Sequence, residues 1–305
     1  MFEKNQKYLI VILGPTASGK TDLSIKIAKT LNSSIISADS RQFFKELNVG
    51  TAKPNISQMK KVKHYFVNNL SVKKKYNAGI FEVDVIKLLK KLFLKTNFVV
   101  MVGGSGMYID AVCNGLDKFP QIPKIFRKKL ILEHQNKGLK FLLKELKIKD
   151  KKYFSIVDHQ NHQRIIRALE VIRFSGKKFS SYIGKSNNKR KFKDIKIGVN
   201  LQKEDLIKLI NKRVDLMIKN GLFSEVKNLI NYKDKNALQT VGYKEIFEYY
   251  ANKVSKIQAI NNIKTNTKKY AKKQLTWFKK DKSIKWINPN FNHMMNYINK
   301  MINSY

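Results

Sequence analysis

A run of eight residues near the start of the chain has the pattern of a phosphate-binding loop. These residues are Gly14, Pro15, Thr16, Ala17, Ser18, Gly19, Lys20 and Thr21, and they fit G-x-x-x-x-G-K-[ST] at every fixed position. The glycines allow successive backbone N–H groups to turn toward a phosphate, and Lys20 adds a positive charge. The Thr21 hydroxyl is a group that binds Mg²⁺ in such loops. We therefore predict a site for a phosphorylated ligand, with Mg²⁺ as cofactor and Thr21 as its protein ligand.

A carboxylate follows the next apolar run of the sequence. Residues 34–38 are expected to form a short buried strand, and Asp39 comes directly after it. Ligands of an open parallel sheet bind beyond the carboxyl ends of its strands, so Asp39 is placed to act as a general base or a metal ligand. The alternative is a cap or turn carboxylate that serves the next helix. Ser40, Arg41 and Gln42 extend this position into a polar cluster that a cap does not need.

A third chemical feature is the glycine-rich turn Gly103–Gly106, which follows the apolar run 98–102. Glycines at such a turn allow close backbone approach, and the Ser105 hydroxyl would face the same crevice as Asp39. The alternative is a plain strand-to-helix turn without a role in chemistry.

Buried parallel strands are needed to bring these three turns together. Continuous apolar runs at 8–13, 34–38 and 98–102 predict such strands, and residues 22–31 have the spacing of a helix with one apolar face. Strands that alternate with helices predict the α/β class, here a P-loop doubly wound parallel sheet.

The composition and hydrophobic pattern of the chain change at about Asp117, after which two prolines precede Lys-rich amphipathic stretches. We predict a mainly helical insertion over residues 117–196, within a core made of residues 1–116 and 197–305. A further strand is expected at 195–199. The last predicted helix runs from about residue 257 to 280.

Two segments of the expected helices combine cations with other recognition groups. Arg164 and Arg167 lie three residues apart on one helix face, which suits a phosphate or base-stacking contact. Residues 270–278 mix lysines with Tyr270, Trp277 and Phe278, a combination that can bind backbone phosphates and exposed bases. The alternative for the second segment is an aromatic core with solvated lysines.

Charge and composition limit the classes of partner and site to consider. The formal net charge is +40 at pH 7, from 62 Lys and Arg against 22 Asp and Glu among 305 residues, and such a field attracts polyanions. Nucleic acid is the first partner to consider, although an A+T-rich genome would also enrich Lys. One cysteine, Cys113, excludes an internal disulfide and a multi-cysteine zinc site. The start, residues 1–7, is short and polar and has no signal sequence or membrane span, so we expect a cytoplasmic protein. Nothing in the sequence suggests an obligate interface, so we expect a monomer.

Seven segments together resemble one known family. They are GPTASGKT (14–21), ISADSRQ (36–42), NVGTAKP (48–54), VGGSGMY (102–108), RALEV (167–171), VGYKE (241–245) and YAKKQLTWF (270–278). In this order they are similar to the tRNA dimethylallyltransferases, also called tRNA isopentenyltransferases, and cover most of the chain. The single cysteine excludes the C-terminal zinc finger of the eukaryotic members, which implies a bacterial-type or organellar enzyme.

The resemblance implies a reaction and a set of roles. The P-loop would hold the diphosphate of dimethylallyl diphosphate, with Arg213 as a further contact, and the acceptor would be an adenine beside the anticodon of tRNA. Asp39 and Ser105 would be the catalytic residues, and the helical insertion would bind the anticodon stem-loop. The positions that correspond to tRNA contacts are Asp39, Ser40, Arg41, Gln42, Ser105, Arg127, Gln163, Arg164, Ile165, Ile166 and Arg167.

The chain departs from the family pattern at two places. Ser105 stands where the family commonly has Thr, which keeps the hydroxyl. Asn161 and His162 stand where the family has an acidic residue followed by Pro.

Three other functions fit part of the pattern. An enzyme that prenylates free adenine nucleotides would need no insertion for an anticodon. A P-loop nucleotide kinase would bind and consume ATP, but it leaves the segments at 48–54 and 270–278 unexplained. An RNA-binding protein with a relic P-loop is opposed by the intact Lys20, Thr21 and Asp39.

Overall fold

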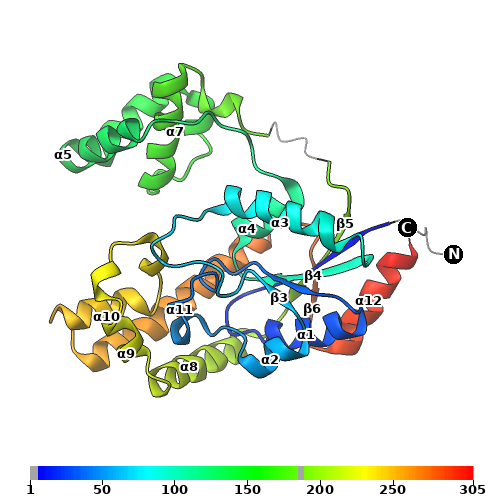
Figure 1. The fold of residues 1–305 in the computed structure, drawn as a ribbon. Helices are drawn as coiled ribbons and strands as arrows, with labels where there is room; N and C mark the ends of the chain where they lie inside the picture. The colour runs from blue at the N-terminus through cyan, green and yellow to red at the C-terminus, as the bar shows by residue number, and fades with distance from the viewer. Residues whose placement is uncertain (1–5, 185–188, 305) are drawn as a thin grey trace. The chain divides into compact units, whose positions relative to one another are not determined.

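A computed structural model describes residues 6–184 and 189–304 of the chain (Figure 1). The chain divides into two compact units. The core unit runs up to Cys113 and resumes at Arg190, and the helical unit comprises Asn114–Lys189. Residues 1–5, part of the predicted polar start, lie outside the described residues.

The core unit is built on one parallel sheet of six strands in the order β3-β2-β4-β1-β5-β6. The strands are β1 (Tyr8–Leu13), β2 (Ile35–Ser37), β3 (His64–Tyr65), β4 (Phe98–Gly103), β5 (Lys193–Val199) and β6 (Lys285–Ile287). The central strand β1 pairs with β4 on one side and with β5 on the other. The predicted P-loop doubly wound α/β sheet is thereby confirmed.

Helices cover both faces of this sheet (Figure 1). Alternate residues of β1 point to opposite faces, as the pleat requires. Leu9 and Val11 belong to the larger core with α3 (Ala78–Leu92) and α4 (Gly106–Asn114), whereas Ile10 and Ile12 pack with α1 (Lys20–Thr30) and α12 (Phe291–Asn303). A strand buried on both faces explains the continuous apolar sequence of β1.

A second group of helices follows β5: α8 (Lys203–Lys219), α9 (Leu222–Lys227), η3 (Ile230–Tyr232), η4 (Asn236–Leu238), α10 (Tyr243–Tyr250) and α11 (Lys256–Phe278). Two short helices, η1 (Val49–Thr51) and α2 (Ile56–Lys61), lie between β2 and β3. Helix α11 contacts both α8 and α10, and α9 contacts η1. The C-terminal part of the chain thereby reaches the segment that follows β2.

The helical unit has a core of its own. It consists of α5 (Lys124–Lys149), α6 (Lys151–Phe154), α7 (His162–Ser175) and η2 (Phe179–Ser181). Gly138 interrupts α5 with φ 75°, a left-handed conformation that glycine adopts without strain. Arg173 on α7 binds Glu133 at 2.7 Å and also contacts Glu145, so it joins both halves of the kinked helix to α7.

The structure differs from the prediction at several elements. The predicted insertion extended to residue 196, but β5 begins at Lys193, where it pairs with Tyr8. Strands β3 and β6 were not predicted, since each is very short and, unlike the buried β2, has no run of buried apolar residues. Helix α12, which follows the helix predicted to be last, was also missed. Within the described ranges, no helix is long and apolar enough to cross a membrane.

Candidate active site

The P-loop joins the end of β1 to the start of α1. Gly14 and Gly19 have φ values of 147° and 77°, and Ala17 also has a positive φ of 65°. These conformations turn the chain around the N-terminus of α1, where free N–H groups and the helix dipole favour an anion. A Cβ on Gly14 would lie 3.3 Å from the carbonyl oxygen of Val199, so the loop also lies tightly against β5.

Lys20 supplies the charge of this loop. Its Nζ donates to the carbonyl of Pro15 and lies 3.3 Å from the hydroxyl of Ser18. Burial, and then the nearby Arg213, lower the pKa of Lys20 to about 7, while Asp39 acts in the opposite direction. Lys20 and Arg213 are two positive charges removed from water, and an anionic ligand between them would stabilise both.

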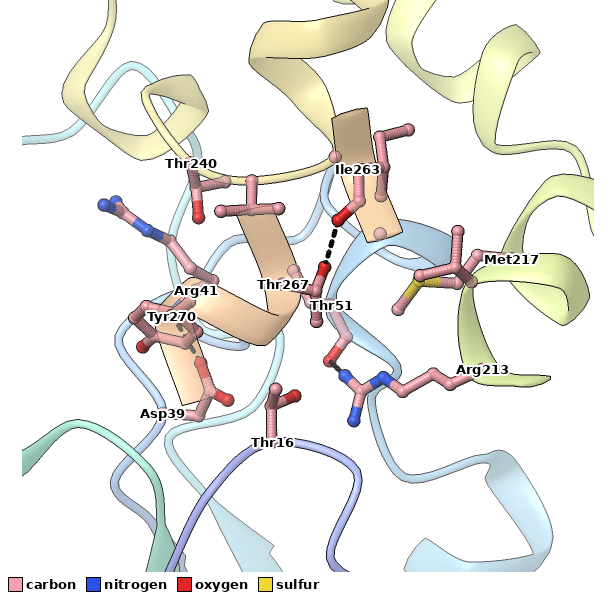
Figure 2. A pocket seen from close by; sticks show the side chains of 14 residues that line it. Thr16, Asp39, Arg41, Thr51, Arg213, Met217, Thr240, Ile263, Thr267 and Tyr270 are labelled. Carbon is pink, nitrogen blue, oxygen red and sulfur yellow. Dashed lines mark hydrogen bonds between the residues drawn. The ribbon is translucent and has the colours of Figure 1, made fainter. Parts of the chain in front are cut away.

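Arg213 on α8 connects two adjoining pockets. The loop pocket lies at the P-loop and is lined by Lys20, Thr21, Lys53 and Arg213, among others. The inner pocket is lined by Thr16, Asp39, Thr51, Arg213 and Tyr270, with an apolar end at Val214, Met217, Val241 and Ile263 (Figure 2). Burial lowers the pKa of Arg213, although the guanidinium stays charged at neutral pH.

Asp39 lies directly beyond β2, as predicted. Its Oδ1 accepts the backbone N–H of Arg41 at 3.0 Å, within a turn and not at a helix N-terminus. The turn-carboxylate alternative is therefore correct for one oxygen. The same side chain also lines the inner pocket beside Tyr270 and Arg213 (Figure 2).

Ser105 is adjacent to this turn. Its hydroxyl accepts the backbone N–H of Ser40 at 3.0 Å and lies 3.2 Å from the Ser40 hydroxyl. A Cβ on Gly103 would lie 2.3 Å from the carbonyl oxygen of Ala38, so only glycine permits this close approach of the two strand ends. The predicted convergence of the second and third turns is therefore observed.

A third pocket opens on the Ser105 side, and we call it the outer pocket. Its lining includes Ser105, Tyr108, Lys244, Lys273 and Trp277. The Trp277 indole donates to Asp110 at 2.8 Å, and Phe278 is buried, so the aromatic part of this segment is partly core. Burial, and then Asp39, raise the pKa of Tyr270 to about 12, which keeps its hydroxyl protonated at neutral pH.

The segment 48–53 forms a wall of the loop and inner pockets and is held by a carboxylate. Glu225 on α9 accepts the backbone N–H groups of Asn48, Val49 and Gly50 at 2.8 to 3.1 Å, and the Tyr243 hydroxyl at 2.6 Å. A Cβ on Gly50 would lie 2.5 Å from the Tyr243 ring, so glycine is required there. This arrangement orients the carbonyl of Thr51 toward Arg213, at 3.4 Å.

The groups near the P-loop suit Mg²⁺ when a diphosphate is present. Thr21 and Asp22 line the loop pocket, and Asp39 is near enough to act on the charge of Lys20. Hydroxyl and carboxylate oxygens are hard donors, and protein-bound Mg²⁺ commonly takes one or two of them together with substrate phosphates and water. Across the described residues, no three Asp, Glu, His or Cys side chains gather into a metal site, so ligand oxygens would have to complete the set.

Only some of the predicted tRNA-contact residues of the helical unit have exposed side chains. Arg127 donates to Glu170 at 2.9 Å and to Gln163 at 2.7 Å, and Arg167 lies 3.4 Å from Glu170. Gln163 and Arg164 are exposed at the start of α7. Ile165 and Ile166 are buried, so their side chains form the core of the unit and are not presented to a ligand.

Sequence reasoning assigned no role to Glu225, Tyr243 and Gln274. The backbone partners of Glu225 are 175 to 177 positions away, and no local pattern indicates such a contact. Tyr243 and Gln274 lay within quoted motifs, and only the fold shows what each of them touches.

The fold and the polar edge of its sheet place this protein among the P-loop enzymes of the doubly wound α/β class. A family model described as IPP transferase matches residues 42–281. The chain is 46% identical to a tRNA dimethylallyltransferase of Christiangramia forsetii, over 97% of this chain and 99% of that protein. A tRNA dimethylallyltransferase of Cytophaga hutchinsonii is 43% identical over 93% of each. The chain therefore belongs to the IPP transferase family.

Solved structures agree with this assignment. A tRNA isopentenylpyrophosphate transferase from Bacillus halodurans has a TM-score of 0.73 and 29% identity, with 98% of each chain covered. A eukaryotic dimethylallyltransferase acting on tRNA has a TM-score of 0.79, with 93% of this chain and 74% of that one covered; at 23% identity it supports the fold alone.

Proposed function

We propose that this protein transfers a dimethylallyl group from dimethylallyl diphosphate to the exocyclic amine of an adenine beside the anticodon of tRNA. One observation carries the proposal beyond family membership. Asp39 lines the inner pocket together with Arg213, and its neighbour Ser40 is bonded to Ser105 at the outer pocket. A carboxylate between an anion-binding pocket and a second, more open one suits transfer from a diphosphate to a separate acceptor.

The step balances with these groups. The bond between the first carbon of the dimethylallyl group and the diphosphate oxygen breaks, and a bond from that carbon to the adenine nitrogen forms. The amine proton passes to Asp39, and diphosphate leaves with the bonding electron pair. Lys20 and Arg213 would bind the leaving diphosphate, and Ser105 would orient the acceptor.

Mg²⁺ would be held by the Thr21 hydroxyl together with the diphosphate, and it would supply neutralising charge as the diphosphate departs. The contribution of the chain itself is to hold the diphosphate at the P-loop while the acceptor enters from the other side.

The helical unit is the proposed site for the anticodon stem-loop. Residues 114–189 contain 19 Lys and Arg against 6 Asp and Glu, a charge that suits phosphate contacts. Gln163 and Arg164 are its exposed predicted contacts, while Arg127 and Arg167 are paired with Glu170. We further propose that the protein works as a monomer in the cytoplasm.

The reaction is tested by offering radiolabelled dimethylallyl diphosphate and Mg²⁺ together with unmodified tRNA, AMP or ATP. We expect label on tRNA, and its loss when EDTA removes the metal. Label on AMP or ATP would instead indicate prenylation of free nucleotides. A parallel reaction with γ-labelled ATP tests the kinase alternative, for which phosphoryl transfer would be diagnostic.

A further inference from the structure

Gln274 is a buried polar side chain of α11 that uses both ends of its amide. The residue is 7% exposed. Its Oε1 accepts the backbone N–H of Thr16 at 2.9 Å, and its Nε2 donates to the carbonyl oxygen of Gly104 at 2.8 Å. A buried amide that finds both a donor and an acceptor is well satisfied, and loss of either partner is costly.

The two partners belong to different loops of the candidate active site. Thr16 lies in the P-loop after β1, and Gly104 lies in the turn after β4, the neighbouring strand. A Cβ on Gly104 would lie 2.3 Å from Nε2 of Gln274, so the glycine leaves the space that the amide occupies. Gln274 of α11 therefore bridges the two loops.

This bridge has consequences on both sides. The N–H of Thr16 donates to Gln274, so this bond ties the P-loop backbone to α11. On the other side, Gly104 precedes Ser105, whose hydroxyl accepts the N–H of Ser40 beside Asp39. The amide thereby connects the loop that would hold the diphosphate to the groups that would handle the acceptor.

We propose that Gln274 is a positioning residue that fixes the distance between the diphosphate loop and the Ser105 loop. This inference rests on the proposed function, because the distance has meaning only for a transfer between two ligands. Gln274 is also part of the outer-pocket lining, but both ends of its amide are bonded to Thr16 and Gly104, and it acts through these two residues. Small misplacement of reacting groups costs rate more than binding, with losses on the order of 100-fold.

An isosteric substitution separates this role from simple packing. In Gln274→Glu, the neutral carboxylic acid accepts from Thr16 and donates to Gly104, as the amide does. The ionised carboxylate has no donor and faces the Gly104 carbonyl oxygen. Burial raises the pKa of such a carboxyl above its ordinary value of about 4.3, so its ionisation moves toward the pH range of the assay.

The experiment measures kcat for transfer to tRNA from about pH 5.5 to about pH 8.5, as the ratio of Gln274→Glu to wild type. Division by wild type removes the pH dependence that the two proteins share. We expect the ratio to fall about 10-fold or more with rising pH, whereas Gln274→Met gives a low and constant ratio. The affinity for inorganic pyrophosphate should change less than kcat.

Gln202→Glu is the matched control, since Gln202 is an exposed residue of the core unit and its substitution adds the same negative charge. Its ratio should be constant and near one. A constant ratio for Gln274→Glu, or an unchanged kcat in Gln274→Met, would overturn the positioning role. If Gln274→Glu does not fold, the kcat of Gln274→Met decides alone. Failure of the wild type to modify tRNA would instead contradict the proposed function.

Discussion

At the scale of single residues, the candidate site depends on a carboxylate among cations. Asp39 uses one oxygen to hold its own turn and lies near Lys20, Arg41 and Arg213, each of which it influences electrostatically. Asp39 partly balances this positive charge. A diphosphate would take over that balance and leave the carboxylate available to accept a proton.

Asp39→Asn tests the proposed base with little change of shape. We expect the rate of transfer to fall by about two to four orders of magnitude, the usual contribution of a positioned base. Pyrophosphate affinity should be kept or increased, because a negative charge is removed beside the anion. Single-turnover kinetics and calorimetric titration measure the two quantities. Turnover equal to wild type would contradict the role.

At the scale of elements, much of the core could be predicted because its signals are local. The strands β1, β2, β4 and β5 and the P-loop were identified from apolar runs and glycine spacing. Strands β3 and β6 are short and only partly buried, so no apolar run indicates them, and pairing with β2 and β5 stabilises them. Helix α12 did carry a signal, since Met294, Ile298 and Ile302 recur every four residues and are buried.

The site was predictable only in part, for the same reason. Asp39, Ser105 and the P-loop follow strands directly, so strand order places them together. Glu225 and Gln274 lie on helices distant in sequence, and their partners are backbone groups that a sequence pattern does not specify. The residues that hold the loops therefore required the structure.

Glu225→Gln tests whether α9 supports the pocket wall at 48–53. An amide offers one acceptor atom where the carboxylate offers two, so the bonds to the backbone of residues 48–50 and to Tyr243 cannot all persist. We expect pyrophosphate affinity to fall about 10-fold and stability by about 1–3 kcal/mol. Calorimetric titration and thermal unfolding measure these effects. Unaltered affinity would show that the segment is held by other contacts.

The Arg173 cluster should make the helical unit sensitive to acid. Hydrogen bonds from Arg173 lower the pKa of Glu133. Burial raises the pKa of Glu145, but the hydrogen bonds and charges of Arg173 and Lys149 together outweigh burial and lower it. Carboxyls with a lower pKa in the folded state stabilise it above their unfolded value of 4.5, and this stabilisation is lost as pH falls through the folded values. Between about pH 5 and pH 3, wild type should lose more stability than Arg173→Met.

Hydrogen exchange of α5 and α7 at neutral and acidic pH provides the comparison. At neutral pH, Arg173→Met should open about 1–3 kcal/mol more easily than wild type. Identical acid dependence in the two proteins would mean that the cluster does not stabilise the unit.

At the scale of the whole molecule, the basic charge and the division into two units imply that the core unit and the helical unit have different functions. The core unit contains all the groups proposed for chemistry, whereas the helical unit contributes exposed cations. Substitutions in the helical unit should therefore affect tRNA and not the diphosphate.

Arg164→Ala tests this division, since Arg164 is exposed at the start of α7. We expect weaker tRNA binding and unchanged pyrophosphate affinity. The slope of the logarithm of the tRNA binding constant against the logarithm of salt concentration should become shallower by about one. Arg167 is less suitable, because its contacts with Glu170 and Phe119 also stabilise the unit. Filter binding at several salt concentrations gives the result. Equal loss of both affinities would mean that the helix supports the core unit.

The identity of the modified nucleoside tests the proposed transfer reaction most directly. Unmodified tRNA is incubated with the protein, dimethylallyl diphosphate and Mg²⁺, digested to nucleosides and analysed by mass spectrometry, with Asp39→Asn as the control. We expect the wild-type reaction to give one adenosine, beside the anticodon, with a dimethylallyl group on its exocyclic nitrogen, and the Asp39→Asn reaction to give very little of this nucleoside. Unmodified adenosine throughout, or equal modification by Asp39→Asn, would contradict this expectation.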